Sequence, residues 1–74
     1  MPSIVMRVRL TSGEHTDVHY EDREARDEAE VVDRVLSTLS SDAGVLRCSH
    51  GDRLVAIFAR GVASIEFAPQ GAVL

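Results

Sequence analysis

Residues 16–39 read TDVHYEDREARDEAEVVDRVLSTL, and within this stretch the spacing of the apolar residues changes. As far as Tyr20, apolar and polar residues alternate, which is the period of a β-strand with one buried face. From Ala25 onward, apolar residues recur every three or four positions, as they do along one side of an α-helix. The change of period predicts a strand followed by a helix.

The expected helix has recognisable signals at both ends. Asp27, followed three residues later by Glu30, is typical of a capping box, and Asp22 is an alternative, earlier cap. Glu30 and Arg34 have the spacing of an i,i+4 ion pair, and Gly44 is suited to a left-handed residue after the helix. The apolar stripe consists of Ala25, Ala29, Val32, Leu36 and Leu39, widened by Val31 and Val35.

The flanking sequence predicts further strands. Residues 3–10 alternate well, and a turn at residues 11–14 joins them to the strand that ends at Tyr20, so these two strands form a β-hairpin. Three more strands follow the helix, at residues 45–49, 54–59 and 62–67. The order ββαβββ predicts a small α+β fold, a mostly antiparallel sheet with one helix packed on one face. We expect one domain over residues 1–74, with an ordered core at about 3–68 and a tail at 69–74.

One helix covers only one face of such a sheet. Residues 54–59 are six consecutive apolar residues, so three of them must point away from the helix. We expect Val55 and Ile57 on that outer face. An apolar patch rimmed by polar residues often marks a protein–protein interface. The predicted interface consists of Val5, Arg7, Arg9, Arg47, Val55 and Ile57. The inward face is expected to carry Ile4, Met6, Val8, Leu10, Val18, Tyr20, Leu46, Cys48, Ile65 and Phe67.

Two structural alternatives also accommodate this apolar run. A strongly curled sheet would enclose both sides of residues 54–59, and the apolar C-terminal tail could fold back over the patch. In either arrangement the outer face would not be available as an interface.

The sequence lacks a recognisable catalytic or ligand-binding motif. Cys48 and His50 form a Cys-x-His pair, but a structural zinc site needs four ligands. His15 and His19 lie near acidic residues without a nucleophile or an implied pocket. The glycines stand singly at turns rather than in a phosphate-binding loop. We therefore expect a protein that is not an enzyme, with no cofactor, no metal and no small-molecule substrate.

The charge distribution bears on the class of partner. Residues 21–42 contain eight acidic residues against three Arg, a net charge of −5, whereas the whole chain carries −4. This acidity argues against general nucleic-acid binding, which needs a basic surface. The sequence shows no targeting signal and no apolar run long enough for a membrane span. We expect a cytoplasmic bacterial interaction module that associates with itself or with a protein partner. The alternative is a nucleic-acid-associated regulator whose basic groove forms on dimerisation.

Overall fold

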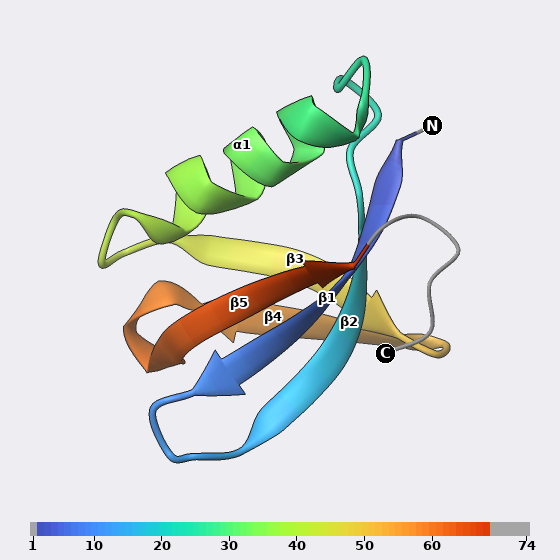
Figure 1. Cartoon of the computed structure of the whole chain (residues 1–74). Coiled ribbons are helices and arrows are strands. Elements are labelled where there is room, and N and C mark those ends of the chain that lie inside the picture. Colours follow the sequence, from blue (N-terminus) through green and yellow to red (C-terminus); the bar gives the residue numbers. More distant parts are fainter. Residues whose placement is uncertain (1, 69–74) are drawn as a thin grey trace.

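The computed structural model describes residues 2–68, and the expected tail at 69–74 lies outside them. The strands form one antiparallel sheet in the order β4-β3-β2-β1-β5, and the single helix α1 packs on one face against β1 and β3 (Figure 1). The predicted α+β fold with ββαβββ order is therefore confirmed. The elements are β1 (Ser3–Leu10), β2 (His15–Glu21), α1 (Glu28–Leu39), β3 (Val45–His50), β4 (Arg53–Phe58), a short 3₁₀ turn η1 (Ala59–Gly61) and β5 (Val62–Ala68).

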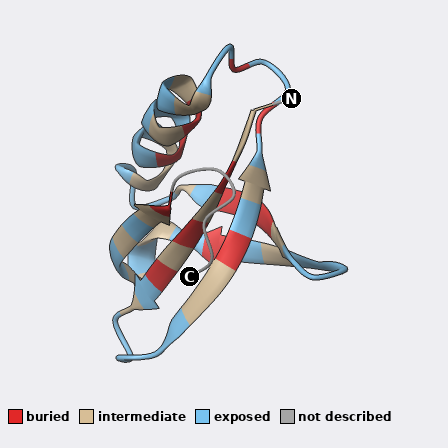
Figure 2. Cartoon of the chain, turned by 45° about the vertical axis from the view of Figure 1, so that its right-hand side comes forward, coloured by how far each residue is buried: buried red, intermediate tan, exposed pale blue. Residues whose placement is uncertain are grey.

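The core lies between the helix and the inward side of the sheet. In β1, Met6 pairs with Val18 of β2, and both are almost fully buried. Buried positions alternate with more exposed ones along these strands (Figure 2). The predicted inward face is confirmed, because six of its residues are buried and the other four are partly buried around them. The six buried ones are Ile4, Met6, Val8, Val18, Leu46 and Cys48.

The pairing of β3 with β4 contradicts the prediction that Val55 and Ile57 face outward. Leu46 lies opposite Ile57, and Cys48 lies opposite Val55. Paired residues of antiparallel strands share a face, so both β4 residues point inward. Ile57 is only 5% exposed, and Val55 packs against the core. Their predicted place on the outer face is wrong, because the turn after His50 sets a register that a run of six apolar residues cannot reveal.

Helix α1 begins one residue after its cap. The Glu30 backbone N–H donates to Asp27 Oδ1 at 3.0 Å, which confirms Asp27 as the N-cap. The Glu30 carboxylate accepts hydrogen bonds from the backbone N–H (3.3 Å) and the Nε (2.8 Å) of Arg26. The expected Glu30–Arg34 pair is therefore wrong, because Arg26 holds the Glu30 side chain at the helix start.

Arg34 instead pairs with an acidic residue that precedes the helix. Its Nε lies 3.0 Å from Oδ2 of Asp22, the only buried charged residue among residues 2–68. The other oxygen of Asp22 accepts from the backbone N–H of Glu24 at 3.0 Å. A buried carboxylate needs such partners, since an unpaired buried charge is strongly destabilising. The pair fastens the connection between β2 and α1 to the middle of the helix.

The inward side of α1 is centred on Val31 and Val35, which are fully buried. Val32 and Leu39 lie at its margin and are partly buried, whereas Leu36 is 51% exposed. The helix is therefore rotated relative to the predicted stripe, so that the two valines that merely widened that stripe form its centre.

Gly44 is required for a reason other than the predicted one. Within residues 2–68, only Gly13 and Gly51 have positive φ, so Gly44 is not a left-handed helix cap. A Cβ atom at this position would instead overlap the Thr38 carbonyl oxygen and approach that of Ser41 to 3.0 Å. Glycine is needed here because the chain passes close to the end of the helix.

The sheet is curled, because the three residues of η1 join β4 at one edge to β5 at the other. The Ala59 N–H donates to the Gly44 carbonyl at 3.0 Å, and the Thr11 N–H donates to that of Gly61 at 2.9 Å. These bonds fasten η1 to the start of β3 and the end of β1. The curling does not enclose both sides of β4, however, since Leu54 is 74% exposed.

Candidate protein-docking site

The outer face of the β3–β4 hairpin carries an apolar patch. Val45 lies opposite Phe58, Arg47 opposite Ala56, and Ser49 opposite Leu54. Leu54, Phe58 and Val45 are 74%, 55% and 43% exposed, and Ala56 between them is exposed as well. We call Val45, Leu54, Ala56 and Phe58 the β3–β4 patch. The patch exists because Val55 and Ile57 take the inward positions of β4 and leave the alternate residues facing outward.

Two shallow hollows border the patch. One, of about 340 Å³, lies at the Val45 and Phe58 end and includes Asp42 and Arg60 in its lining. The other, of about 220 Å³, lies at the Leu54 end and includes Arg47 and Glu21. Both are open, and both place charged side chains beside exposed apolar ones. An apolar centre with a charged rim has the composition of a protein–protein interface.

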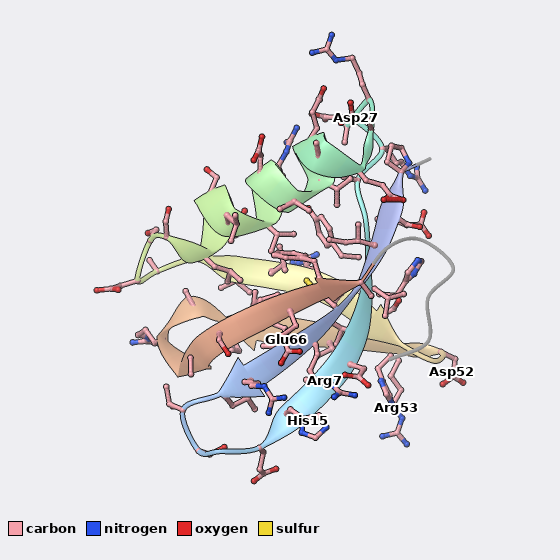
Figure 3. The ribbon with its side chains drawn as sticks, in the orientation of Figure 1. Arg7, His15, Asp27, Asp52, Arg53 and Glu66 are labelled. Atoms are coloured by element: carbon pink, nitrogen blue, oxygen red, sulfur yellow. The ribbon has the colours of Figure 1, made fainter. Side chains whose placement is uncertain are left out.

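The other half of the outer face is polar and is neutralised within the chain. Arg7 makes a two-point contact with Asp17, at 2.8 Å and 3.1 Å, and Arg9 Nε lies 2.7 Å from Glu66. Arg7, His15 and Glu66 lie close together on this side of the sheet (Figure 3). Hydrogen bonds from Arg7 and Arg9 lower the pKa of Asp17 and Glu66, respectively. Two cross-strand ion pairs therefore neutralise this half of the outer face.

These ion pairs bear on the nucleic-acid alternative. A basic groove would need the Arg residues of the outer face, which include Arg7, Arg9 and Arg47. Arg7 and Arg9 each already face a carboxylate, so neither offers its full charge to phosphate. Arg47 is exposed and has no ion pair within the described residues.

The structure separates the predicted interface residues. Val5 is half-buried on the outer face between His19 and Ala68. Arg7, Arg9 and Arg47 also lie on that face, whereas Val55 and Ile57 lie inside. Leu54 and Phe58, which form the exposed apolar group together with Val45, were not predicted to lie on the outer face. The signal that could have found them is the two-residue turn Gly51-Asp52, which pairs His50 with Arg53 and fixes the register of the whole hairpin.

The histidines and the cysteine do not form a reactive group. His50 Nδ1 lies 2.6 Å from the Asp17 carbonyl oxygen, and the hydrogen bond there fixes the ring on the surface. Cys48 is buried, and burial raises the pKa of its thiol to about 11, so it stays protonated at neutral pH. Over residues 2–68, no three His, Cys, Asp or Glu side chains gather in a way that could hold a metal ion.

Comparison with family models, curated proteins and solved structures finds no match to this chain. In the part of the chain that the structure describes, the one helix is neither long nor apolar enough to cross a membrane. The geometry of the outer sheet face is therefore the basis for assigning a role.

Proposed function

We propose that the protein is a small non-enzymatic interaction module, a homo-oligomer or an accessory subunit, that associates with protein through the β3–β4 patch. One observation carries the proposal. Four large apolar side chains are exposed among residues 2–68, and three of them lie together on this hairpin. Scattered exposed apolar residues are normal on a protein surface, whereas a group of them beside charged residues is typical of a binding surface.

The free energy available at the patch is sufficient for association. Full burial of one large apolar side chain is worth about 1.5–3 kcal/mol. Covering the exposed parts of Val45, Leu54 and Phe58 therefore contributes on the order of 3–5 kcal/mol. Arg47 lies across from Ala56 and is free to orient a partner, since rim charges mainly set specificity and encounter rate.

A matched pair of variants tests this proposal. Replacement of both Leu54 and Phe58 by Ser removes the apolar side chains of the patch, and Leu36→Ser removes the remaining large exposed one, on α1. Circular dichroism first shows that the variants are folded. Wild-type protein and each variant are then immobilised, and the amount of added protein that each retains is compared. The wild-type chain itself is one of the proteins added. We expect the double variant to lose specific retention and Leu36→Ser to keep it. Equal retention by wild type and the double variant would contradict the proposal.

A further inference from the structure

Strand β4, which carries most of the patch, is also an edge of the sheet. It pairs with β3 on one side, and no other described strand pairs with its second side. Natural edge strands are usually protected by lysine, proline, a bulge or a charge pointing inward. Between Leu54 and Phe58, β4 has none of these, and Arg53 stands only at its first position. The backbone N–H and C=O groups of this edge are a template for another strand.

The sequence of β4 is complementary to itself in one antiparallel register. If two copies pair about Ala56, then Leu54 of each lies opposite Phe58 of the other on the outer face. On the inward face, Val55 lies opposite Ile57 of the second copy. Every directly opposed pair along the strand centre is then apolar, which favours cross-strand packing.

The charges flanking β4 select the same register. Asp52 directly precedes the strand and Arg60 follows it by two residues. Asp52 lies in the turn before the strand and Arg60 in η1 after it, so pairing about Ala56 brings the Asp52 end of one copy beside the Arg60 end of the other, at both ends of the paired strands. Pairing about Val55 would instead place Phe58 opposite Asp52, and pairing about Ile57 would place Leu54 opposite Arg60. Opposite charges across strands stabilise, and a charge against an apolar residue does not.

The other edge of the sheet is a weaker candidate. Strand β5 exposes no large apolar side chain, since Ile65 and Phe67 are partly covered. Its only charged residue, Glu66, is already paired with Arg9. A groove of about 310 Å³ lies between β5 and the second half of α1, with Leu36 at its rim, but no feature of that groove selects an occupant.

We propose that the partner at the β3–β4 patch is a second copy of this chain, joined edge to edge through β4 about a two-fold axis at Ala56. This inference rests on the proposed function and names its partner. It makes one continuous ten-stranded sheet and packs Leu54 of each copy beside Phe58 of the other on the shared outer face. Strand-edge pairing of six-residue strands buries little area, so the dimer belongs to the small, reversible class of interfaces.

A cysteine placed on the two-fold axis tests the register. Opposed residues of antiparallel strands have Cα atoms about 4.5–5.5 Å apart, within the range of roughly 4.4–6.8 Å that a disulfide spans. Under oxidised glutathione, Ala56→Cys should form a cross-linked dimer of twice the 8.1 kDa chain mass. Ala63→Cys, at an exposed position on β5, is the matched control. Cys48 is buried and does not interfere. Cross-linking of both variants at the same rate, or of neither, would overturn the proposed pairing.

Charge exchange tests the identity of the partner. One variant carries Leu54→Glu with Phe58→Glu, and the other carries Leu54→Arg with Phe58→Arg. Each should be monomeric alone because like charges then face each other, and an equimolar mixture should recover a mixed dimer. A mixture that stays monomeric while the wild type is dimeric would overturn the register.

The two proposals can fail separately. A wild type that is monomeric at every concentration overturns the second-copy proposal. The proposed function then stands if retention of another protein still depends on Leu54 and Phe58. If the wild type dimerises and none of these variants changes its mass, both proposals are wrong.

Discussion

Gly44 shows how one atom can be decisive at the residue scale. Its hypothetical Cβ atom would overlap the backbone of Thr38, which cannot move without disturbing the end of the helix. We predict that Gly44→Ala lowers the free energy of unfolding by about 1–3 kcal/mol, the usual cost of overpacking. Gly61→Ala is the control, since no atom lies within 4 Å of its added Cβ and its φ is not positive. Urea denaturation of both variants checks this, and equal losses would contradict it.

The ion pair between Arg7 and Asp17 predicts a dependence of stability on pH. The hydrogen bond from Arg7 lowers the pKa of Asp17 in the folded protein. The pair therefore stabilises the fold above the ordinary aspartate pKa of about 4, and this contribution is lost as the pH falls through the lowered value. We predict that wild type exceeds Asp17→Asn in unfolding free energy at pH 6, and that the difference shrinks below about pH 4. Denaturation curves between pH 3 and 7 check this. A difference that stays constant, or grows in acid, would be inconsistent with the pair.

At the scale of elements, the orientation of β4 decides which face of the molecule is apolar. Ile57 is buried in the core, whereas Leu54 of the same strand is mostly exposed. We predict that Ile57→Ala lowers the free energy of unfolding by about 2–5 kcal/mol, whereas Leu54→Ala changes that of the monomer by about 0.5 kcal/mol or less. Thermal or urea unfolding of dilute protein separates the two. If Leu54→Ala lowered the free energy of unfolding more than Ile57→Ala, then Ile57 would have to lie on the outer face.

The elements could be predicted from the sequence where a single period dominates. The alternation of residues 3–10 specifies a strand and its buried face, and both are present in the structure. The three-and-four spacing specifies a helix, which is also present, but its buried side is centred on Val31 and Val35 rather than on the predicted stripe. The six apolar residues of 54–59 contain no period, so they specify a strand without saying which side faces in. That side depends on the register with β3, which a tight turn sets. Arg34 and Gly44 were misassigned for a related reason, because their partners Asp22 and Thr38 are identified only once the chain is folded.

At the scale of the whole molecule, the helix packs on one face of a small sheet, and the apolar patch lies on the opposite face. One helix of 12 residues covers the inward face, and no other element among residues 2–68 covers the outer one. On the polar half of that outer face, Arg7 pairs with Asp17 and Arg9 pairs with Glu66. The apolar side chains of the β3–β4 patch have no comparable partners among the described residues. Small domains have little core and frequently gain stability by association.

The absolute mass in solution, measured by light scattering over a dilution series under reducing conditions, tests the central claim most directly. We expect a mass that approaches twice 8.1 kDa at high concentration and falls to 8.1 kDa on dilution. We also expect that Leu54→Glu with Phe58→Glu keeps the single-chain mass throughout, while Leu36→Ser follows the wild type. A wild-type mass of 8.1 kDa at every concentration, or a dimer that the double variant leaves unchanged, would contradict a dimer joined through β4.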